Sequence, residues 1–598
     1  MAKSQSELSS TDDKRSDSPL VHAQSVTFDR PLELELGGEL ASVRCVYETW
    51  GTLNADGTNA ILVCHAISGD SHAARHDAND EPGWWDRLIG PGKPIDTNQF
   101  FVVCPNVLGG CRGTTGPGDI NPDTNQPYGA DFPRITLGDI VEMQRRLSEH
   151  IGIDRWRAII GGSLGGHQAI TWVTRYPECT DLCVAIATSP RLTSQALGFD
   201  VVARNAIQTD PHFADGQYYS NDQRPDTGLA IARMLGHITY LSSEAMDAKF
   251  DPDRHDPREI QSTFEQRFSV GSYLAHQGQK FVTRFDANSY VTLSMAMDLF
   301  DLGDNRLKLM EEFDESQCDL VVVSFSSDWL FPPQQSRNIV NALTALDKPV
   351  TYAEITTDAG HDAFLIDRDI DQYSPLIRAR LGDIDESPPS LSIADEAIVE
   401  LVAEHQSFLD LGCGRGELLS RLQTLGKGPL MGVEVAQDNL LAAASRGLNV
   451  IDYDLNKGLP AFIDNQFDVV VLNSTLQAVE NIEELFEEML RVGTQVVVSF
   501  PNFAYKQLRQ HYSHDGRSPK APGQFEFEWY NTPNRRFPSI ADVLEFCAQR
   551  GAQVLDAIYL DSLSGTRIDP KDEPNLNADT AILVVSRPTP KAELQLDR

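Results

Sequence analysis

Residues 158–169 read AIIGGSLGGHQA, which is an apolar strand, then Gly-x-Ser-x-Gly, then a run that favours a helix. A sharp strand-to-helix turn can lift a serine out of a sheet only where its neighbours lack bulk, and Gly161 and Gly165 supply that space. The amide of Leu164 then stands at a helix N-terminus, where it can stabilise an oxyanion. The stretch therefore predicts an α/β fold in which Ser163 is a nucleophile.

A serine nucleophile needs a general base and a carboxylate that orients the base. An apolar run over residues 320–325 is followed by Asp328, and a later loop places His361 directly after a glycine. These residues follow Ser163 in the order Ser, Asp, His expected for such a turn. The sequence thus predicts a catalytic triad of Ser163, Asp328 and His361. In the alternative, Asp328 caps a helix over residues 332–343 and His361 is a surface residue.

Short β-branched runs alternate with amphipathic stretches around this motif, a pattern typical of a mostly parallel sheet flanked by helices. The runs are 60–64, 100–104, 157–160, 181–188 and 320–325. Between about residues 190 and 303 helical patterns replace them, so we expect a helical cap inserted over the edge of the sheet where ligands bind. The loop after residues 60–64 is placed to offer a second oxyanion donor, the amide of Ile67.

Residues 383–390 have the composition of a linker, because they are acidic, rich in proline and without apolar periodicity. They separate a first α/β domain over residues 21–382 from a second domain over residues 391–598, where the alternation of strands and helices resumes. Residues 1–20 are polar and lack the apolar core of a signal peptide, so we expect a disordered tail there.

The 598 residues carry 50 Lys and Arg against 87 Asp and Glu, a formal net charge of −37. An anionic surface of this size repels phosphate backbones and acidic membranes, which argues against nucleic-acid and membrane binding. No apolar run approaches the ~20 residues that span a bilayer. The nine cysteines are scattered without a Cys-x-x-Cys pair, so neither a disulfide framework nor a zinc cluster is indicated. We expect a cytoplasmic protein without a metal.

Seven segments of the first domain together resemble the homoserine O-acetyltransferase family. They are YETWGTLN (47–54), AISGDS (66–71), NVLGGCRGTTGP (106–117), GGSLGG (161–166), RMLGHITYLS (233–242), RFDANSY (284–290) and GHDAF (360–364). The resemblance implies an α/β-hydrolase fold with a helical cap, a homodimer formed through that cap, and acyl transfer from a CoA thioester to L-homoserine. It also implies that Arg233 holds the homoserine carboxylate and that Asp362 holds the amino group. A ping-pong path through an acylated Ser163 agrees with this chemistry.

Two departures from the family pattern bear on the acyl pocket. His167 stands where the family commonly has Met, and Leu330 stands where members that use succinyl-CoA resemble one another in carrying Arg. A succinyl carboxylate that is buried without a partner costs several kcal/mol, whereas an apolar wall suits a methyl end. We therefore expect acetyl-CoA as the donor. The alternatives are succinyl-CoA, with a cation such as Arg337 as its partner, and a serine esterase or thioesterase that uses water as acceptor.

The second domain contains FLDLGCGRGE at residues 408–417, a strand followed by Gly-x-Gly-x-Gly. Glycines let the backbone pass close to a ligand, and Glu434 ends the next predicted strand, where a carboxylate can bind both hydroxyls of a ribose. On its own the motif fits NAD, S-adenosylmethionine (SAM) or a Rossmann-like unit that has lost its ligand. The pattern resembles class I SAM-dependent methyltransferases, which implies a SAM site of Asp410, Gly412, Gly414, Glu434 and Asp454.

Three further segments of this domain are similar to the methionine biosynthesis protein W family. They are FDVVVLNSTLQA (467–478), FPNF (500–503) and EWYNTPN (528–534). This resemblance implies a methyltransferase fold, but no methyl acceptor follows from it. Because methionine is the precursor of SAM, a SAM site fused to an early enzyme of that route suggests feedback, or only the co-localisation of two activities.

Overall fold

The structure is a computed structural model that describes residues 20–251, 269–382, 389–522 and 525–588. These fall into two compact units, Met1–Ala342 with Glu354–Ile377, and Leu343–Ala353 with Arg378–Arg598. Of the expected tail only Leu20 is described, and residues 383–388 of the expected linker lie outside the described residues. The units change at Ile377, shortly before the predicted domain end at residue 382.

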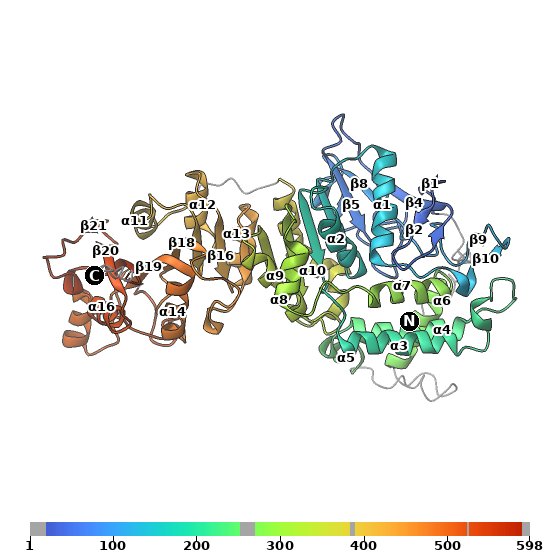
Figure 1. The fold of residues 1–598 in the computed structure, drawn as a ribbon. Coiled ribbons are helices and arrows are strands. Elements are labelled where there is room, and N and C mark those ends of the chain that lie inside the picture. The colour runs from blue at the N-terminus through green and yellow to red at the C-terminus, as the bar shows by residue number, and fades with distance from the viewer. Residues whose placement is uncertain (1–19, 252–268, 383–388, 523–524, 589–598) are drawn as a thin grey trace, which may run out of the picture. The chain divides into compact units, whose positions relative to one another are not determined.

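The first unit is built on a sheet that is parallel except at one edge (Figure 1). In spatial order its strands are β1 (Gln24–Phe28), β4 (Val43–Trp50), β8 (Phe101–Pro105), β5 (Ala60–Cys64), β11 (Ala158–Gly162), β12 (Leu182–Ile186) and β13 (Asp319–Phe325). β4 pairs antiparallel with β1 and β8, and the other pairs are parallel. Every residue of β5, β11 and β12 is buried, as expected of central strands covered on both faces.

Helices cover this sheet and lead into its functional loops. They are α1 (Leu137–Ile151), α2 (Leu164–Arg175), α8 (Arg306–Phe313), α9 (Pro333–Ala345) and α10 (Asp367–Arg380), and β14 (Val350–Ile355) precedes the loop that carries His361. Three pairs of two-residue strands lie outside the sheet: β2 (Leu32–Glu33) with β3 (Glu39–Leu40), β6 (Ile89–Gly90) with β7 (Ile95–Asp96), and β9 (Ile120–Asn121) with β10 (Gln126–Pro127).

Between Pro190 and Gly303, all the secondary-structure elements that the described residues form are helices, as expected for a helical cap. The cap helices are α3 (Ser194–Gln208), α4 (Asp226–Tyr240), α5 (Ser243–Phe250), α6 (Ser269–Val282) and α7 (Ala287–Asp298). They lie together along one side of the first unit (Figure 1). Residues of α3, α4 and α7 line a cavity together with Ser163, so the cap covers the carboxyl end of β11.

The run of sheet strands in the second unit is ordered β17 (Val450–Asp452), β16 (Leu430–Glu434), β15 (Phe408–Leu411), β18 (Phe467–Asn473), β19 (Gly493–Pro501), β22 (Thr580–Ser586), β20 (Gln553–Asp561) and β21 (Thr566–Arg567). It is parallel from β17 to β19, and β22 runs antiparallel between β19 and β20. The strand order reverses between β15 and β18, which is where doubly wound sheets bind ligands.

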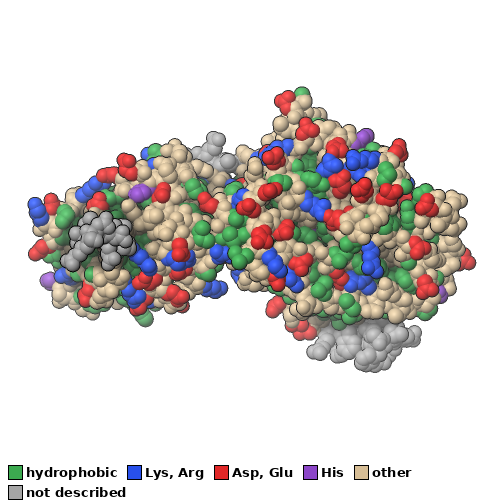
Figure 2. All heavy atoms as spheres, viewed as in Figure 1, with side chains coloured by type: hydrophobic (Ala, Val, Ile, Leu, Met, Phe, Trp, Pro, Cys, Tyr) green, Lys and Arg blue, Asp and Glu red, His purple; other side chains and the backbone are tan. Residues whose placement is uncertain are grey.

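Seven α-helices accompany these strands in the described residues. They are α11 (Ile393–Leu401), α12 (Glu417–Thr424), α13 (Gln437–Ser445), α14 (Ile482–Val492), α15 (Lys506–Gln510), α16 (Ile540–Gln549) and α17 (Pro574–Asn577). Across the described parts of both units, no helix combines the length and the apolar character that crossing a bilayer requires. Figure 2 shows acidic and basic side chains intermixed over the visible surface.

Candidate active site

Ser163 lies at the turn between β11 and α2 with φ 58° and ψ −124°, a strained backbone for a residue that carries a side chain. Its amide donates to Ile186 O at 2.9 Å, which ties the turn to β12. A Cβ on Gly161 would lie 2.1 Å from Gly165 O, and a Cβ on Gly165 would lie 2.0 Å from Cys64 O. Only glycine fits at both positions, so the local sequence itself forces the serine outward.

The structure brings Ser163, His361 and Asp328 into one hydrogen-bonded chain. His361 Nε2 lies 2.9 Å from Ser163 Oγ, and His361 Nδ1 lies 2.7 Å from Asp328 Oδ2. The other carboxylate oxygen of Asp328 accepts the amides of Leu330 and Phe331 at 3.0 and 2.9 Å, which fixes its orientation. This is the geometry in which a histidine can take a proton from a serine.

The charges around the three hydrogen-bonded residues favour the protonated form of His361. Burial disfavours the imidazolium, but the charge and hydrogen bond of Asp328 and the charge of Asp362 together outweigh burial and raise the pKa of His361 above its ordinary value. All three triad side chains are buried, so the pair of His361 and Asp328 is shielded from bulk water.

The two expected oxyanion donors lie beside the serine, because Ile67 lines the same cavity as Ser163 and Leu164 follows it directly. Among the described residues, no acceptor is recorded for the amide of either Ile67 or Leu164. His65 supports the Ile67 loop from below. Its Nδ1 donates to Ala66 O at 2.7 Å, and its Nε2 accepts the amide of Val107 at 3.1 Å.

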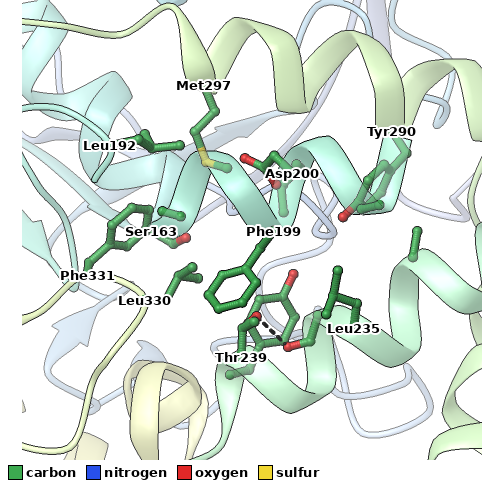
Figure 3. Close-up of a pocket in the computed structure, with 16 residues that line it drawn as sticks. Ser163, Leu192, Phe199, Asp200, Leu235, Thr239, Tyr290, Met297, Leu330 and Phe331 are labelled. Carbon is green, nitrogen blue, oxygen red and sulfur yellow. Dashed lines mark hydrogen bonds between the residues drawn. The ribbon is translucent and has the colours of Figure 1, made fainter. Parts of the chain in front are cut away.

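The cavity above Ser163 has mostly apolar walls (Figure 3). Leu330 and Phe331 come from the loop after β13, and the cap contributes among others Phe199, Asp200 and Met297. None of the described residues that line it is Lys or Arg. Leu330 therefore forms part of an apolar wall, as the sequence predicts.

Asp200 is a cavity residue that the sequence analysis missed. It sits on α3 and faces Asp298, and burial together with this second carboxyl raises its pKa well above the ordinary value. A carboxyl inside an otherwise apolar helical stretch was the available signal, but only the packing of α3 over Ser163 shows that it faces the pocket.

Asp362 lies beside His361 and within range of the charge of Arg233. Arg233 lies on α4 with its guanidinium 4.8 Å from the Phe281 ring and 5.6 Å from the Tyr240 ring, and no described carboxylate forms an ion pair with it. Burial raises the pKa of Asp362, and the nearby charges of His361 and Arg233 oppose that rise. The guanidinium thus remains available to an anionic group of a substrate.

His167 proves to be a packing residue beneath the cavity. Its ring is fully buried against Phe300 and Phe331, with centroids 4.5 and 5.3 Å apart, and its Nε2 lies 3.2 Å from Ser189 Oγ. Burial, and after it the charge of the neighbouring His361, lower the pKa of His167 to about 3. It therefore stays neutral and packs against Phe331, which lines the cavity.

The glycine turn of the second unit lies at the end of β15, at the reversal of strand order. Gly412 and Gly414 have φ 75° and 57°, and a Cβ on Gly414 would meet nothing within 4 Å, so the turn faces open space there. Asp410 is buried, its Oδ1 has no hydrogen-bond partner, and burial, followed by neighbouring carboxylates, raises its pKa to about 8.

Glu434 ends β16 beside this turn and accepts the amide of Gly414 at 2.8 Å. Its other oxygen accepts the amides of Val435 and Ala436. Asp454 follows the next strand, β17, where its carboxylate caps a short helical turn through the amide of Asn456. The orphaned Asp410 oxygen and the open space at Gly414 fit a ligand that brings hydrogen-bond donors, as the hydroxyl and ammonium groups of SAM would.

Comparison with known proteins identifies a family for each of the two domains. Residues 59–367 match the family described as alpha/beta hydrolase fold, and residues 394–585 match the family described as methionine biosynthesis protein MetW. The bifunctional methionine biosynthesis protein MetXA/MetW of Rhodopirellula baltica is 68% identical over 599 residues, which cover 98% of this chain and 96% of that protein. These matches confirm the fold class and both resemblances that the motifs indicate.

Relatives of the first unit alone carry different donor names. The homoserine O-succinyltransferase of Alkalilimnicola ehrlichii is 50% identical over 369 residues, covering 61% of this chain and 96% of that protein. The crystal structure of homoserine O-acetyltransferase from Bacillus anthracis superposes with a TM-score of 0.54 at 29% identity, over 61% of this chain and 98% of that one. The comparisons therefore leave acetyl and succinyl donors both open.

Proposed function

The chain belongs to the α/β-hydrolase-fold family of bifunctional MetXA/MetW methionine biosynthesis proteins, and we propose on this basis that it is a homoserine O-acyltransferase. The observation that carries the proposal is the hydrogen-bonded chain of Ser163, His361 and Asp328 under a cap whose helix α4 bears Arg233. The three hydrogen-bonded residues supply a nucleophile, and Arg233 supplies a cation for the carboxylate of an amino-acid substrate.

In the first half-reaction His361 Nε2 takes the proton of Ser163 as Oγ attacks the thioester carbon of acyl-CoA. The amides of Ile67 and Leu164 hold the oxyanion of the tetrahedral intermediate. When the C–S bond breaks, CoA leaves as a thiol with the proton from His361, and the acyl group stays on Ser163. Asp328 keeps Nδ1 of His361 protonated and so leaves Nε2 free to act as the base.

In the second half-reaction the hydroxyl of homoserine attacks the acyl-serine and gives its proton to His361. That proton then passes to Ser163 Oγ as the acyl-enzyme bond breaks, which restores the enzyme. Arg233 would hold the carboxylate of homoserine in a bidentate pair, and Asp362, next to the base, would hold its ammonium group. A clamp for both ends of an amino acid is what favours homoserine over water as acceptor.

For the donor we propose acetyl-CoA. The support is a cavity whose described lining includes Leu330 and the carboxyl of Asp200 but no cation. Arg337, the cation that could have met a succinyl group, is paired with Glu354. A second carboxylate brought into this cavity would be desolvated without a partner, which costs several kcal/mol.

Intact-mass measurement tests the proposed reaction. Mixing the protein with acyl-CoA and no homoserine should add one acyl group on the peptide that holds Ser163, and the Ser163→Ala variant should stay unmodified. Adding homoserine should discharge the adduct as O-acylhomoserine. Rapid discharge to the free acid without homoserine would identify an esterase instead, and labelling at another residue would refute the assignment of Ser163.

For the second unit we propose SAM binding at the turn after β15. Gly412 and Gly414 would let the backbone approach the ligand, and Asp410 and Glu434 would accept its donors, with Asp454 on the adenine side. Calorimetric titration of SAM into the full chain should show binding that Gly414→Val removes, because a branched side chain would fill the open space against the turn. Equal binding by the variant would place the ligand elsewhere.

We further propose a homodimer formed through the cap. Large apolar side chains on α3 and α4 are exposed there: Val201, Val202, Ile231 and Ile238. Sedimentation should report twice the chain mass for the wild type, and Val202→Asp with Ile231→Asp should yield monomers. A monomeric wild type would refute this assembly.

A further inference from the structure

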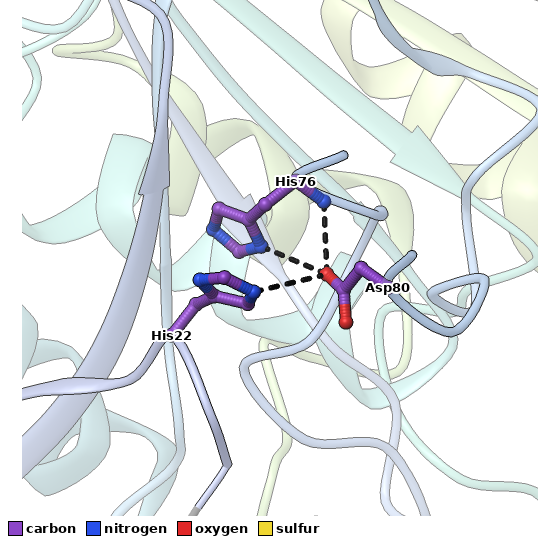
Figure 4. Close-up of side chains that lie close together, drawn as sticks. All are labelled: His22, His76 and Asp80. Atoms are coloured by element: carbon purple, nitrogen blue, oxygen red, sulfur yellow. Dashed lines mark hydrogen bonds and ion pairs between the residues drawn. The ribbon is translucent and has the colours of Figure 1, made fainter. Parts of the chain in front are cut away.

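Three histidines and two carboxylates gather outside the triad, in the segment that continues from the oxyanion loop. His72, His76 and Asp80 lie 5 to 13 residues after Ile67, while Glu48 lies on β4 and His22 precedes β1. The ligand atoms of His22, His76 and Asp80 all lie within 4.8 Å of one another (Figure 4). The ligand atoms of Glu48, His72 and His76 form a second group within the same distance.

The distances between these atoms match a first coordination shell. His76 Nδ1 lies 3.2 Å from Asp80 Oδ2 and 3.6 Å from Glu48 Oε2, and His22 Nε2 lies 3.7 Å from Asp80 Oδ2. Bonds of about 2.0–2.1 Å from zinc to four tetrahedral ligands place neighbouring ligand atoms ~3.3 Å apart. An ion between them would draw the atoms in by only a few tenths of an ångström.

His72 is held as a support rather than as a ligand. Its Nδ1 lies 2.9 Å from Glu48 Oε2, and its Nε2 lies 2.9 Å from Glu81 O, so both ring nitrogens face oxygen acceptors. The contact with His72 holds the Glu48 carboxylate beside His76, whose Nδ1 lies 3.6 Å from Glu48 Oε2.

The remaining groups are preorganised. The His76 ring is stacked between the His22 ring at 4.2 Å and the Trp50 ring at 4.8 Å. Asp80 Oδ2 also accepts the backbone amide of His76 at 2.9 Å. Glu48 is fully buried, whereas the side chain of His22 is 34% exposed and leaves an approach from solvent.

We propose that His22, His76 and Asp80 bind a divalent transition-metal ion, for which Zn²⁺ is the first choice. Two imidazoles and a carboxylate are a mixed nitrogen and oxygen set that suits zinc and its neighbours rather than Mg²⁺ or Ca²⁺. Glu48 lies beside His76 as a further carboxylate next to this group. The ion would tie residue 22 to the segment that extends from the oxyanion loop.

No metal was expected from the sequence, because the nine cysteines are scattered without a Cys-x-x-Cys pair. The proposed ligands come instead from two distant segments of the chain, at residue 22 and at residues 76–80. Only the pairing of β1 with β4 and the path of the following loop bring them together.

Metal analysis of the full chain tests the proposal. Protein stripped with a chelator, reloaded with Zn²⁺ and dialysed should retain about one ion per chain by plasma mass spectrometry and melt at a higher temperature than the stripped protein. His76→Gln and His22→Gln should each lose the retained zinc and the rise in melting temperature. His514→Ala, which removes an exposed histidine from the second unit, should behave as the wild type.

Reloading with Co²⁺ identifies the ligands. The site should show the visible bands of four-coordinate cobalt without a near-ultraviolet thiolate band, because none of the proposed ligands is a cysteine. The thiolate band is the control for competing ligands, since all nine cysteines are free thiols. The proposal fails if the wild type retains no metal or if a thiolate band appears. It also fails if the His22→Gln variant retains as much metal as the wild type. Because the His22 side chain is partly exposed, this variant should fold normally.

Discussion

Leu330→Arg should shift the donor preference from acetyl-CoA towards succinyl-CoA. Leu330 lines the cavity that contains Ser163, and its amide is fixed on Asp328 Oδ1 at 3.0 Å, so a new side chain at this position starts beside the acyl group. The guanidinium would then meet the far carboxylate of a succinyl group inside a cavity whose described lining has no other cation.

The size of the effect follows from the geometry. A carboxylate ~4 Å from a guanidinium gains roughly 4 kcal/mol at an effective dielectric constant of ~20. Ordering the long side chain takes back up to about 2 kcal/mol, and desolvation takes more. A net gain of about 1.4 kcal/mol changes the ratio of kcat/KM for the two donors tenfold. We expect the wild type to favour acetyl-CoA by at least that factor and the variant to narrow or reverse the preference.

The assay follows release of the CoA thiol at saturating homoserine with each donor. Leu330→Met keeps the volume without the charge and should keep the wild-type ratio. Asp200 could capture the new guanidinium, so Leu330→Arg with Asp200→Asn should favour succinyl-CoA more strongly than Leu330→Arg alone. A wild type that is faster with succinyl-CoA, or a ratio that Leu330→Arg leaves unchanged, would refute the reasoning.

Five further outcomes are expected. Asp328→Asn should lower kcat by about 10⁴-fold while the circular dichroism spectrum is retained, because the tautomer of the base is no longer fixed. Acylation of the wild type should fall as the pH drops through a midpoint above 6.5, since His361 must be neutral to act and its pKa is raised; a midpoint below 6.5 would contradict this. Arg233→Ala should reduce transfer to homoserine while burst acylation stays near normal, and an equal loss in both steps would exclude the carboxylate role. Glu434→Gln should weaken SAM binding by about tenfold in calorimetry, and unchanged affinity would remove the residue from the site. Gly165→Ala should lower the free energy of unfolding by about 3 kcal/mol in denaturant titration, because the added methyl group would lie 2.0 Å from a backbone oxygen.

Much of the candidate active site could be predicted because its key element is a short turn. The turn that exposes Ser163 depends on Gly161, which lies against Gly165 four residues later, and on Gly165, which lies against Cys64 at the end of β5. The chain order of Ser163, Asp328 and His361 then follows from the topology of a parallel sheet, whose loops at the carboxyl ends of strands meet at one edge. The same reasoning places the glycine turn after β15 in the second unit.

The sequence by itself thus determined the two α/β halves, the elbow and the triad, because backbone sterics and hydrophobic periodicity act over short distances. Tertiary structure alone decided what lies across the cavity from Ser163, where Asp200 and Leu330 come from the cap and from the loop after β13. It also decided the group formed by His22 and His76, because side chains from segments without fixed spacing meet only when long-range strand pairing and packing bring their backbones together.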